Sequence, residues 1–305
     1  MAITYKLLPQ IETFFRECVV KPYEEHEVSE TWTTEVTKQD WRYHTNIILD
    51  RGRTDFRKEC NGLSQRDKII LYCYYYMQMH TVSGYHTFRL ARKEHKLNFL
   101  DNILFVDFGC GPLTSAVSLA WHNLKVRPEG NEGLQFRYVG IDISKHMLSY
   151  AKKISDDCGL FHADSVFEFV RSSKVQHELP RIINEHREAS GGKELTVVLN
   201  CSYYFASRSL NVAGLTTYIT ELVSEYLPND KVCLVFQNPD NDSLNETWEQ
   251  FKKGVKGVLR ELSRTSETIY YYDVTRQRTG LPHISLRREY LLNDKWLKQS
   301  DIKRI

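Results

Sequence analysis

The sequence lacks any run of about 18 apolar residues, the length that a helix needs to cross a bilayer. Residues 1–18 include acids and lack the apolar core and the small-residue cleavage site of a signal peptide. We therefore expect neither a membrane span nor a secretory leader.

Cysteine is scarce, and its spacing fits no known framework. The chain has seven cysteines, an odd number, and no Cys-x-x-Cys pair. Secreted disulfide scaffolds and zinc or iron–sulfur sites depend on paired, regularly spaced cysteines. The pattern argues against both classes, predicts no metal site, and indicates free thiols in the reducing cytoplasm.

The chain also lacks a strong excess of charge, because 41 Lys and Arg residues face 39 Asp and Glu residues. Proteins that hold nucleic acid by bulk charge are far more basic than this net charge of +2. Bulk charge therefore does not indicate a nucleic-acid partner, although a local basic face can still contact RNA. A hydrophobic content of 41% and a charged content of 26% are typical of an ordered globular protein.

Residues 1–100 show no regular alternation of strands and helices and are rich in aromatic residues and histidine. A helix is predicted after Ser64, since its hydroxyl can cap free backbone N–H groups and Asp67 lies in the first turn. Tyr72, Tyr76 and His80 fall on one face of this helix. We expect residues 1–100 to form a mainly helical lid for substrate recognition, and residues 101–305 to form a second domain.

From residue 101 onward, short apolar runs alternate with helical patterns. Strands are predicted over residues 103–107, 135–142, a third run ending at 163–164, 195–199 and 231–236. Helices are predicted over residues 113–124, 144–154, 165–188 with a break at Pro180, 212–226 and 243–263. Residues 267–276 and 283–292 predict a hairpin around a turn at 279–282. The fold class is therefore α/β: a doubly wound, Rossmann-like, mostly parallel seven-stranded sheet that ends in an antiparallel hairpin.

A glycine loop follows the first of these strands. The segment Val106-Asp-Phe-Gly-Cys-Gly-Pro112 lets the backbone turn tightly and approach a ligand, and the next helix offers free N–H groups. Dinucleotide-binding loops have a third small residue and an acid about 20 residues on. Here the third position is Thr114 and the acid, Asp142, lies farther along, so a pyrophosphate ligand is disfavoured.

Four segments together resemble the class I S-adenosylmethionine-dependent methyltransferases. They are Val106-Asp-Phe-Gly-Cys-Gly-Pro112, Val139-Gly-Ile-Asp-Ile-Ser-Lys-His-Met-Leu148, His162-Ala-Asp164 and Val198-Leu-Asn-Cys-Ser202. The final hairpin matches the sheet of that family, and the resemblance covers about residues 100–292. One position departs from it, because Leu113 stands where many members have a further glycine.

The resemblance implies S-adenosylmethionine as the cofactor and assigns a role to each matching residue. The loop of Gly109 and Gly111 would hold the amino-acid tail with help from Asp107, and Asp142 would accept both ribose hydroxyls. The remaining implied contacts are Ile143 and Met147 at the adenine face, Asp164 and Ser165 at the adenine amino group, and Asn200 and Cys201 near the methyl group.

Each of these residues also has a structural interpretation. The glycines can serve a turn alone, and Asp142 and Asp164 can cap the helices that follow them. Met147 on an apolar helix face is more often part of a core than an adenine contact.

The methyl acceptor leaves a weaker signal. Tyr203 and Tyr204 are the candidate catalytic residues, because they can stack on an acceptor ring or orient its nucleophile, although strand-end aromatics often enter the core. The segment Asn200-Cys-Ser-Tyr-Tyr204 lacks the paired prolines of the family's amino-methylating branch. Tyr76 and His80, together with Tyr85 and His86, can line an acceptor pocket, and the pair Arg287-Arg288 can contact phosphate or protect a sheet edge.

The sequence therefore predicts a methyltransferase with an unidentified acceptor, which can be a small molecule, a protein or RNA. Two alternatives stay open: a nicotinamide-dependent oxidoreductase on a similar sheet, and a catalytically silent binding or scaffold module. The oligomeric state leaves no signal in the sequence.

Overall fold

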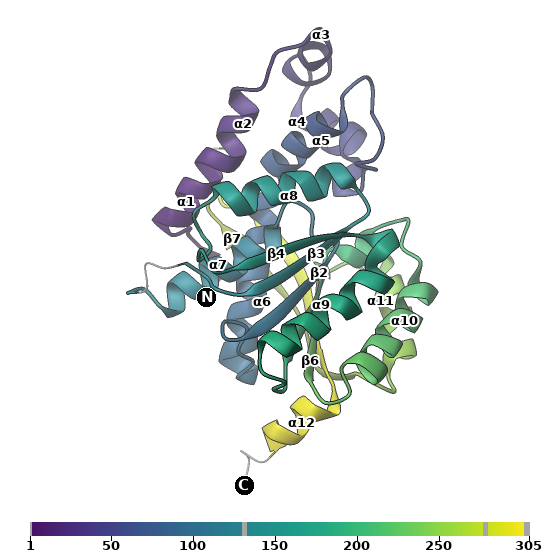
Figure 1. The fold of residues 1–305 in the computed structure, drawn as a ribbon. Helices are drawn as coiled ribbons and strands as arrows, with labels where there is room; N and C mark the ends of the chain where they lie inside the picture. Colours follow the sequence, from purple (N-terminus) through teal and green to yellow (C-terminus); the bar gives the residue numbers. More distant parts are fainter. Residues whose placement is uncertain (1, 130–132, 277–279, 302–305) are drawn as a thin grey trace.

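The computed structural model describes residues 2–129, 133–276 and 280–301, and its centre is an eight-stranded sheet (Figure 1). The strand order is β1-β7-β8-β6-β5-β2-β3-β4. The strands are β1 (Ile3–Tyr5), β2 (Ile103–Phe108), β3 (Arg137–Asp142), β4 (Val166–Arg171), β5 (Thr196–Ser202), β6 (Lys231–Pro239), β7 (Arg260–Tyr271) and β8 (His283–Leu292). Strands β2 to β6 run parallel to one another, and β8 runs antiparallel to both β6 and β7.

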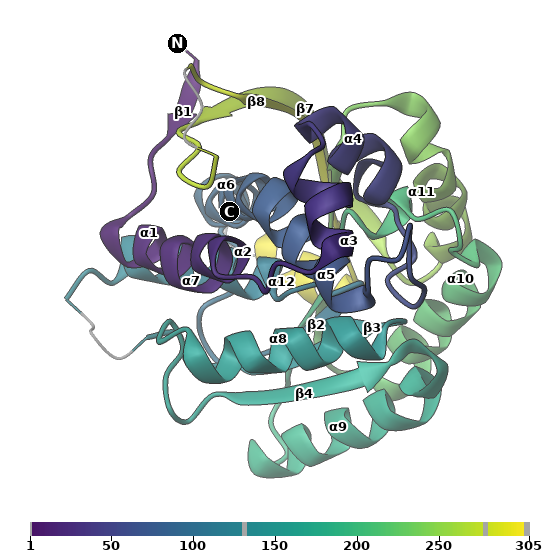
Figure 2. The same cartoon turned by 90° about the horizontal axis from the view of Figure 1, so that it is seen from above.

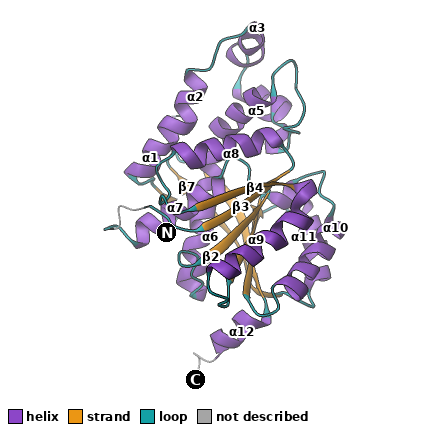
Figure 3. Ribbon diagram, viewed as in Figure 1, coloured by secondary structure: helices purple, strands orange, loops and turns teal. Residues whose placement is uncertain are grey.

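Helices cover both faces of the sheet, as Figure 3 shows by colour. The helices α6 (Gln78–His95), α7 (Thr114–Val126) and α8 (Lys145–Asp157) contribute to one core, and α9 (Val175–Ala189), α10 (Val212–Glu221) and α11 (Asp242–Val255) contribute to the other. Strand β2 serves both cores, because Ile103 and Phe105 face the first and Leu104 and Val106 face the second. The predicted α/β class with its antiparallel ending is confirmed.

The first hundred residues are mainly helical. They form α1 (Pro9–Phe15), α2 (Lys21–Glu24), α3 (Glu30–Trp32), α4 (Trp41–Tyr43), α5 (Gln65–Tyr72) and π-helical turns, and α3, α4 and α5 lie at the end of the molecule opposite α12 (Asp294–Asp301) (Figures 1 and 2). The predicted cap is present, since Ser64 Oγ accepts from the N–H of Asp67 and the Asp67 carboxylate accepts from the N–H of Ser64. The domain division at residue 100 stays a prediction.

The number of strands differs from the predicted seven because β1 adds an eighth. It pairs in parallel with β7, with Ile3 opposite Ile269. Three residues give too little periodicity for a strand to be predicted from sequence. The first hundred residues therefore contribute to the same sheet as the rest of the chain.

Three other boundaries correct the sequence prediction. The third strand does not end at residues 163–164: β4 begins only at Val166, where a helix was expected. Helix α9 continues through Pro180, because burial of Leu179, Pro180, Ile182 and Ile183 against the sheet offsets the lost backbone bond. Helix α11 ends at Val255, and β7 begins at Arg260 inside the predicted helix. Residue 279, at the start of the predicted hairpin turn, lies outside the described residues.

Candidate functional site

A cavity of about 830 Å³ opens where the parallel strands β2, β3, β4 and β5 end. This edge of an open α/β sheet is where ligands bind, because the loops that follow the strands converge there. Loops after all four strands contribute to the lining, and so do residues 51–56 and the helical face of residues 72–80. The volume lies near the upper end of the range of about 300–1,000 Å³ for small-molecule pockets.

The glycine loop after β2 forms one side of this cavity. Gly109 has φ of +70°, and a Cβ atom on it would lie 2.7 Å from Cδ2 of Tyr204. Gly111 has φ of +52°, which favours glycine, and a Cβ atom there would lie 3.9 Å from the Gly109 carbonyl oxygen, an ordinary van der Waals contact. The N–H groups of Gly109 and Cys110 donate to the Ile141 carbonyl at 2.8 and 3.0 Å, which fixes the turn.

Leu113, the position that departs from the family pattern, ends the loop in a left-handed conformation with φ of +65°. Its side chain is fully buried, and its backbone begins α7. The N–H groups of residues 114–116 have no carbonyl partner within the helix, because the first turn of any helix lacks them. Thr114 and Ser115 line the cavity, so the start of this helix faces the cavity.

Asp142 ends β3 across from the glycine loop and lines the cavity. Its Oδ1 accepts from the N–H of Ser144 at 2.8 Å, and its Oδ2 accepts from the N–H of Gly111 at 3.4 Å. Burial raises the pKa of Asp142 to about 6, against the opposing effect of these backbone bonds. A carboxylate has about four acceptor positions, so each oxygen keeps capacity for a ligand hydroxyl.

Ile143 and Met147 follow Asp142 and also line the cavity. Ile143 is 45% exposed, so its side chain is accessible from the cavity. Met147 is buried on the first turn of α8, whose cap Ser144 accepts from its N–H at 3.3 Å. Both residues are therefore placed to flank a flat ligand beside Asp142.

Asp107 lies beneath the loop and does not appear among the cavity-lining residues. Its Oδ1 accepts from Asn200 Nδ2 at 2.6 Å, and its Oδ2 accepts from the Tyr138 hydroxyl at 2.7 Å. Asn200 also donates to Ser115 Oγ at 2.9 Å. Burial raises the pKa of Asp107 to about 6. Asp107, Asn200 and Cys201 are buried and none of them lines the cavity, so the direct contacts expected of them with the amino-acid tail and the methyl group are not supported. Asp107 and Asn200 instead position Ser115, which does line the cavity.

Asp164 and Ser165 lie away from the cavity, at the opposite edge of the sheet. Because β4 begins at Val166 and runs parallel to β3, these residues precede the strand instead of ending it. Asp164 is exposed and lies 3.5 Å from His162, and Ser165 Oγ donates to the Leu134 carbonyl. Ser172 and Ser173, which follow β4 directly, line the cavity instead, and the β-branched and aromatic residues of 166–171 are the sequence signal that could have predicted this strand.

Tyr203 and Tyr204 both line the cavity. Tyr203 has φ of +58°, a conformation that is costly for an aromatic residue, and its N–H donates to the Gln237 carbonyl at 2.8 Å. Its hydroxyl lies 2.9 Å from Ser83 Oγ. The Tyr203 ring stacks on His80 with 3.9 Å between centroids. The end of β5 and helix α6 are thus joined at the cavity wall.

His80 is held in its neutral form at this wall. Burial lowers the pKa of His80 to about 3, and the Tyr72 hydroxyl lies 3.1 Å from its Nδ1. The Tyr76 ring lies nearly parallel to that of His80, with 6.0 Å between centroids, as the helical spacing predicts. Tyr85 and His86 lie elsewhere: Tyr85 stacks on Trp121 with 4.0 Å between centroids, and His86 is fully buried beside Glu267.

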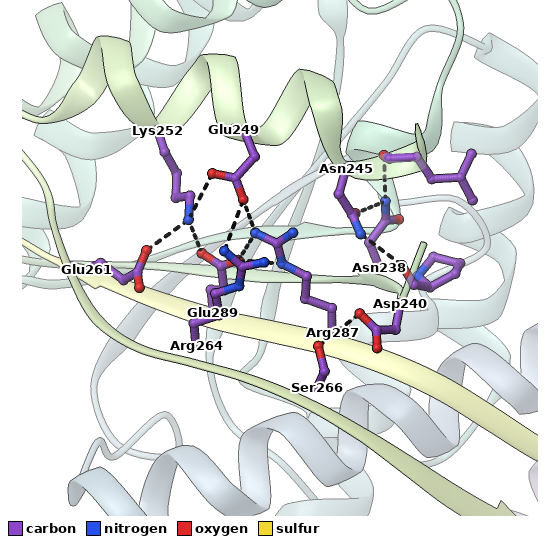
Figure 4. Close-up of polar contacts among 12 residues, drawn as sticks. Asn238, Asp240, Asn245, Glu249, Lys252, Glu261, Arg264, Ser266, Arg287 and Glu289 are labelled. Carbon is purple, nitrogen blue, oxygen red and sulfur yellow. Dashed lines mark hydrogen bonds and ion pairs between the residues drawn. The ribbon is translucent and has the colours of Figure 1, made fainter. Parts of the chain in front are cut away.

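The arginine pair of β8 faces carboxylates instead of the cavity. Arg287 pairs with Glu249 and Glu289, which also bind Lys252 (Figure 4). Arg288 pairs with Glu267 at 2.7 Å and with Glu94 at 2.9 Å. Both guanidinium groups are buried and neutralised, so the phosphate role and the edge-protection role are both unsupported.

No protein-family model matches the chain, and no curated protein sequence matches it. Solved structures do. One is a Geobacter metallireducens precorrin-6y C5,15-methyltransferase (9% identity, 70% of this chain and 88% of that chain, TM-score 0.37). Another is a Listeria monocytogenes protein named provisionally as a class I S-adenosylmethionine-dependent methyltransferase (10% identity, 94% of this chain and 88% of that chain, TM-score 0.37). A third is a Methanosarcina mazei S-adenosylmethionine-dependent methyltransferase (14% identity, 64% of this chain and 95% of that chain, TM-score 0.35).

Proposed function

We propose that this chain is an S-adenosylmethionine-dependent methyltransferase. The observation that carries the proposal is the Asp142 carboxylate, which ends β3 beside the glycine loop and keeps acceptor capacity at the cavity. A ribose diol presents two hydroxyl donors, which match two carboxylate oxygens. The glycine loop and the start of α7 supply backbone N–H groups for the cofactor's carboxylate. S-adenosylmethionine has no phosphate, so the site needs no phosphate-binding loop.

The residues present fit such a cofactor. Gly111 lines the cavity without a side chain, which leaves room for an amino-acid tail, and the start of α7 with Ser115 would hold it. Asp142 would hold the ribose, and Ile143 and Met147 would flank the adenine. Ser172 and Ser173, at the end of β4, take the place expected of Asp164 and Ser165 as polar groups near the adenine edge.

When bound, the cofactor supplies an electrophilic methyl group to a nucleophile of the acceptor. The chain itself orients the acceptor and excludes water, which suffices for an in-line displacement. His80 is a poor proton acceptor, since burial lowers its pKa to about 3. We therefore assign His80 a positioning role at the cavity wall, and not the role of a general base.

Calorimetry with S-adenosylhomocysteine tests the proposal. We expect saturable, one-to-one binding with micromolar affinity and an increase in melting temperature. Reduced nicotinamide cofactor, added in parallel, should leave its fluorescence unchanged. Binding of the nicotinamide compound in place of S-adenosylhomocysteine would favour the oxidoreductase alternative and contradict the proposal.

A methyl-transfer screen separates the enzyme from a silent module. With radiolabelled cofactor, extracts fractionated into metabolites, protein and RNA should show label in one fraction. A chain that binds S-adenosylhomocysteine but labels none of these fractions would be the catalytically silent module instead.

A further inference from the structure

One wall of the cavity consists of aromatic rings that the proposed cofactor contacts leave unused. The Tyr72 ring lies 5.3 Å from that of Phe56 and 5.5 Å from that of Tyr76, between centroids. The wall continues through His80 to Tyr203, and all five residues line the cavity. A surface of ring faces and edges inside a pocket binds flat aromatic molecules by stacking.

Two arginines lie next to this aromatic wall. Arg51 and Arg53 line the cavity from the loop of residues 50–53. A Cβ atom on Gly52, between them, would lie 3.8 Å from Cε2 of Tyr72 and from Cε1 of Tyr76, so the loop backbone rests on the wall. Burial raises the pKa of Tyr76 to about 12, and the charge of Arg276, followed by those of Arg51 and Arg53, opposes this rise.

The loop carries more positive charge than its own acid can neutralise. Asp50 pairs with Arg53 at 3.5 Å and with Arg208 at 3.3 Å, and Arg51 Nε donates to the neutral amide oxygen of Asn46 at 3.2 Å. Two guanidinium groups thus share the Asp50 carboxylate, and Arg51 bonds to a neutral amide. Asp50, Arg51 and Gly52 all have positive φ, at 42°, 54° and 85°, so the backbone adopts a costly conformation that holds these side chains at the rim.

We propose that the acceptor bound in this cavity is a small planar aromatic acid, whose ring stacks on the wall of Phe56, Tyr72, Tyr76, His80 and Tyr203 and whose carboxylate pairs with Arg51 and Arg53. The inference rests on the proposed methyltransferase function, and it names the class of acceptor. A guanidinium binds a carboxylate through two parallel hydrogen bonds, which gives the pair both strength and orientation. A small molecule is favoured over a protein or RNA acceptor, because the five rings that would bind it line a cavity of about 830 Å³.

Three matched compounds test the two halves of this recognition separately. 4-Hydroxybenzoate has a flat ring and a carboxylate, 4-hydroxybenzamide keeps the ring without the charge, and 4-hydroxycyclohexanecarboxylate keeps the charge without the flat ring. We expect calorimetry in the presence of saturating S-adenosylhomocysteine to show millimolar or tighter binding of the benzoate. Each of the other two compounds should bind about tenfold more weakly or worse.

The variant R51Q tests whether Arg51 in the loop of residues 50–53 binds the carboxylate of the ligand. It should weaken benzoate binding about tenfold and leave benzamide and S-adenosylhomocysteine binding within about twofold. The control is R42Q, which removes an exposed arginine of α4 that is not among the cavity-lining residues and should change none of these affinities.

Three results would overturn the inference. The first is the absence of saturable benzoate binding up to about 10 mM, and the second is equal affinity for benzoate and benzamide. The third is a loss of S-adenosylhomocysteine affinity in R51Q with benzoate binding unchanged, since the arginine would then serve the cofactor's own carboxylate. Failure of the wild-type chain to bind S-adenosylhomocysteine would instead contradict the proposed function, and benzoate binding measured without it would still test the aromatic acid site.

Discussion

The two halves of the cavity are built in different ways. The half assigned to the cofactor comes mainly from residues 109–147, where a loop, a helix, a strand and the start of a second helix follow one another along the chain, with Ser172 and Ser173 after β4. The half assigned to the acceptor combines residues 51–56 and 72–80 of the N-terminal region with Tyr203 after β5. Local motifs position the first half, whereas long-range packing positions the second, so the two halves should respond differently to substitution.

The largest expected effect is on the cofactor half, at Gly109. The variant G109A adds a Cβ atom 2.7 Å from Tyr204 at a φ of +70°, so strain and overpacking should together cost about 3 kcal/mol of unfolding free energy. Gly159 is the matched control, because it also has positive φ but no atom within 4 Å of its Cβ position. G159A should therefore cost only about 1 kcal/mol in thermal or urea unfolding. Equal losses would show that the close approach at Gly109 contributes nothing.

The second effect is the pH dependence of cofactor binding. Burial raises the pKa of Asp142 to about 6, and only the ionised carboxylate can accept both hydroxyl bonds. Affinity for S-adenosylhomocysteine should be constant above pH 7 and fall about tenfold per pH unit below 6, because protonation competes with binding. The variant D142N should bind weakly at every pH and lose this dependence. A wild-type affinity that stays constant from pH 7 to pH 5 would contradict the assignment.

The smallest effect should come from the acceptor half, at Tyr203. Replacing Tyr203 by Phe removes the hydrogen bond to Ser83 while the ring remains on His80, at a cost of about 1 kcal/mol in unfolding. S-Adenosylhomocysteine affinity should stay within about twofold, since the two halves use different residues. A large loss of cofactor affinity in Y203F, measured by calorimetry, would show that the halves are not separate.

The sequence predicts the first half well because its signals are local. Gly109 and Gly111 follow an apolar strand directly, and Asp142 ends the next strand, so parallel pairing brings them to one edge. The cap at Ser144 also follows from the residue type alone. Gly109 and Gly111, with Asp142, Ile143 and Met147, reach the cavity as the fold requires.

The sequence fails where position depends on where a strand begins. Asp164 follows a short apolar stretch, which suggested the end of a strand. The strand instead begins after Asp164 and ends directly before Ser172. Arg51 and Arg53 leave no local signal, because only the packing of Gly52 against two tyrosines brings them to the cavity. Asp107 shows a third kind of error: its position is as predicted, but its hydrogen bonds are directed to Asn200 and Tyr138.

The most direct test compares two aspartates that the sequence motifs place together and the fold separates. Asp142 lines the cavity, whereas Asp164 is exposed at the opposite edge of the sheet. Calorimetry with S-adenosylhomocysteine should show a loss of about 100-fold in D142A, from two charge-assisted hydrogen bonds, and no change in D164A. Retained micromolar affinity in D142A, or an equal loss in D164A, would contradict the account.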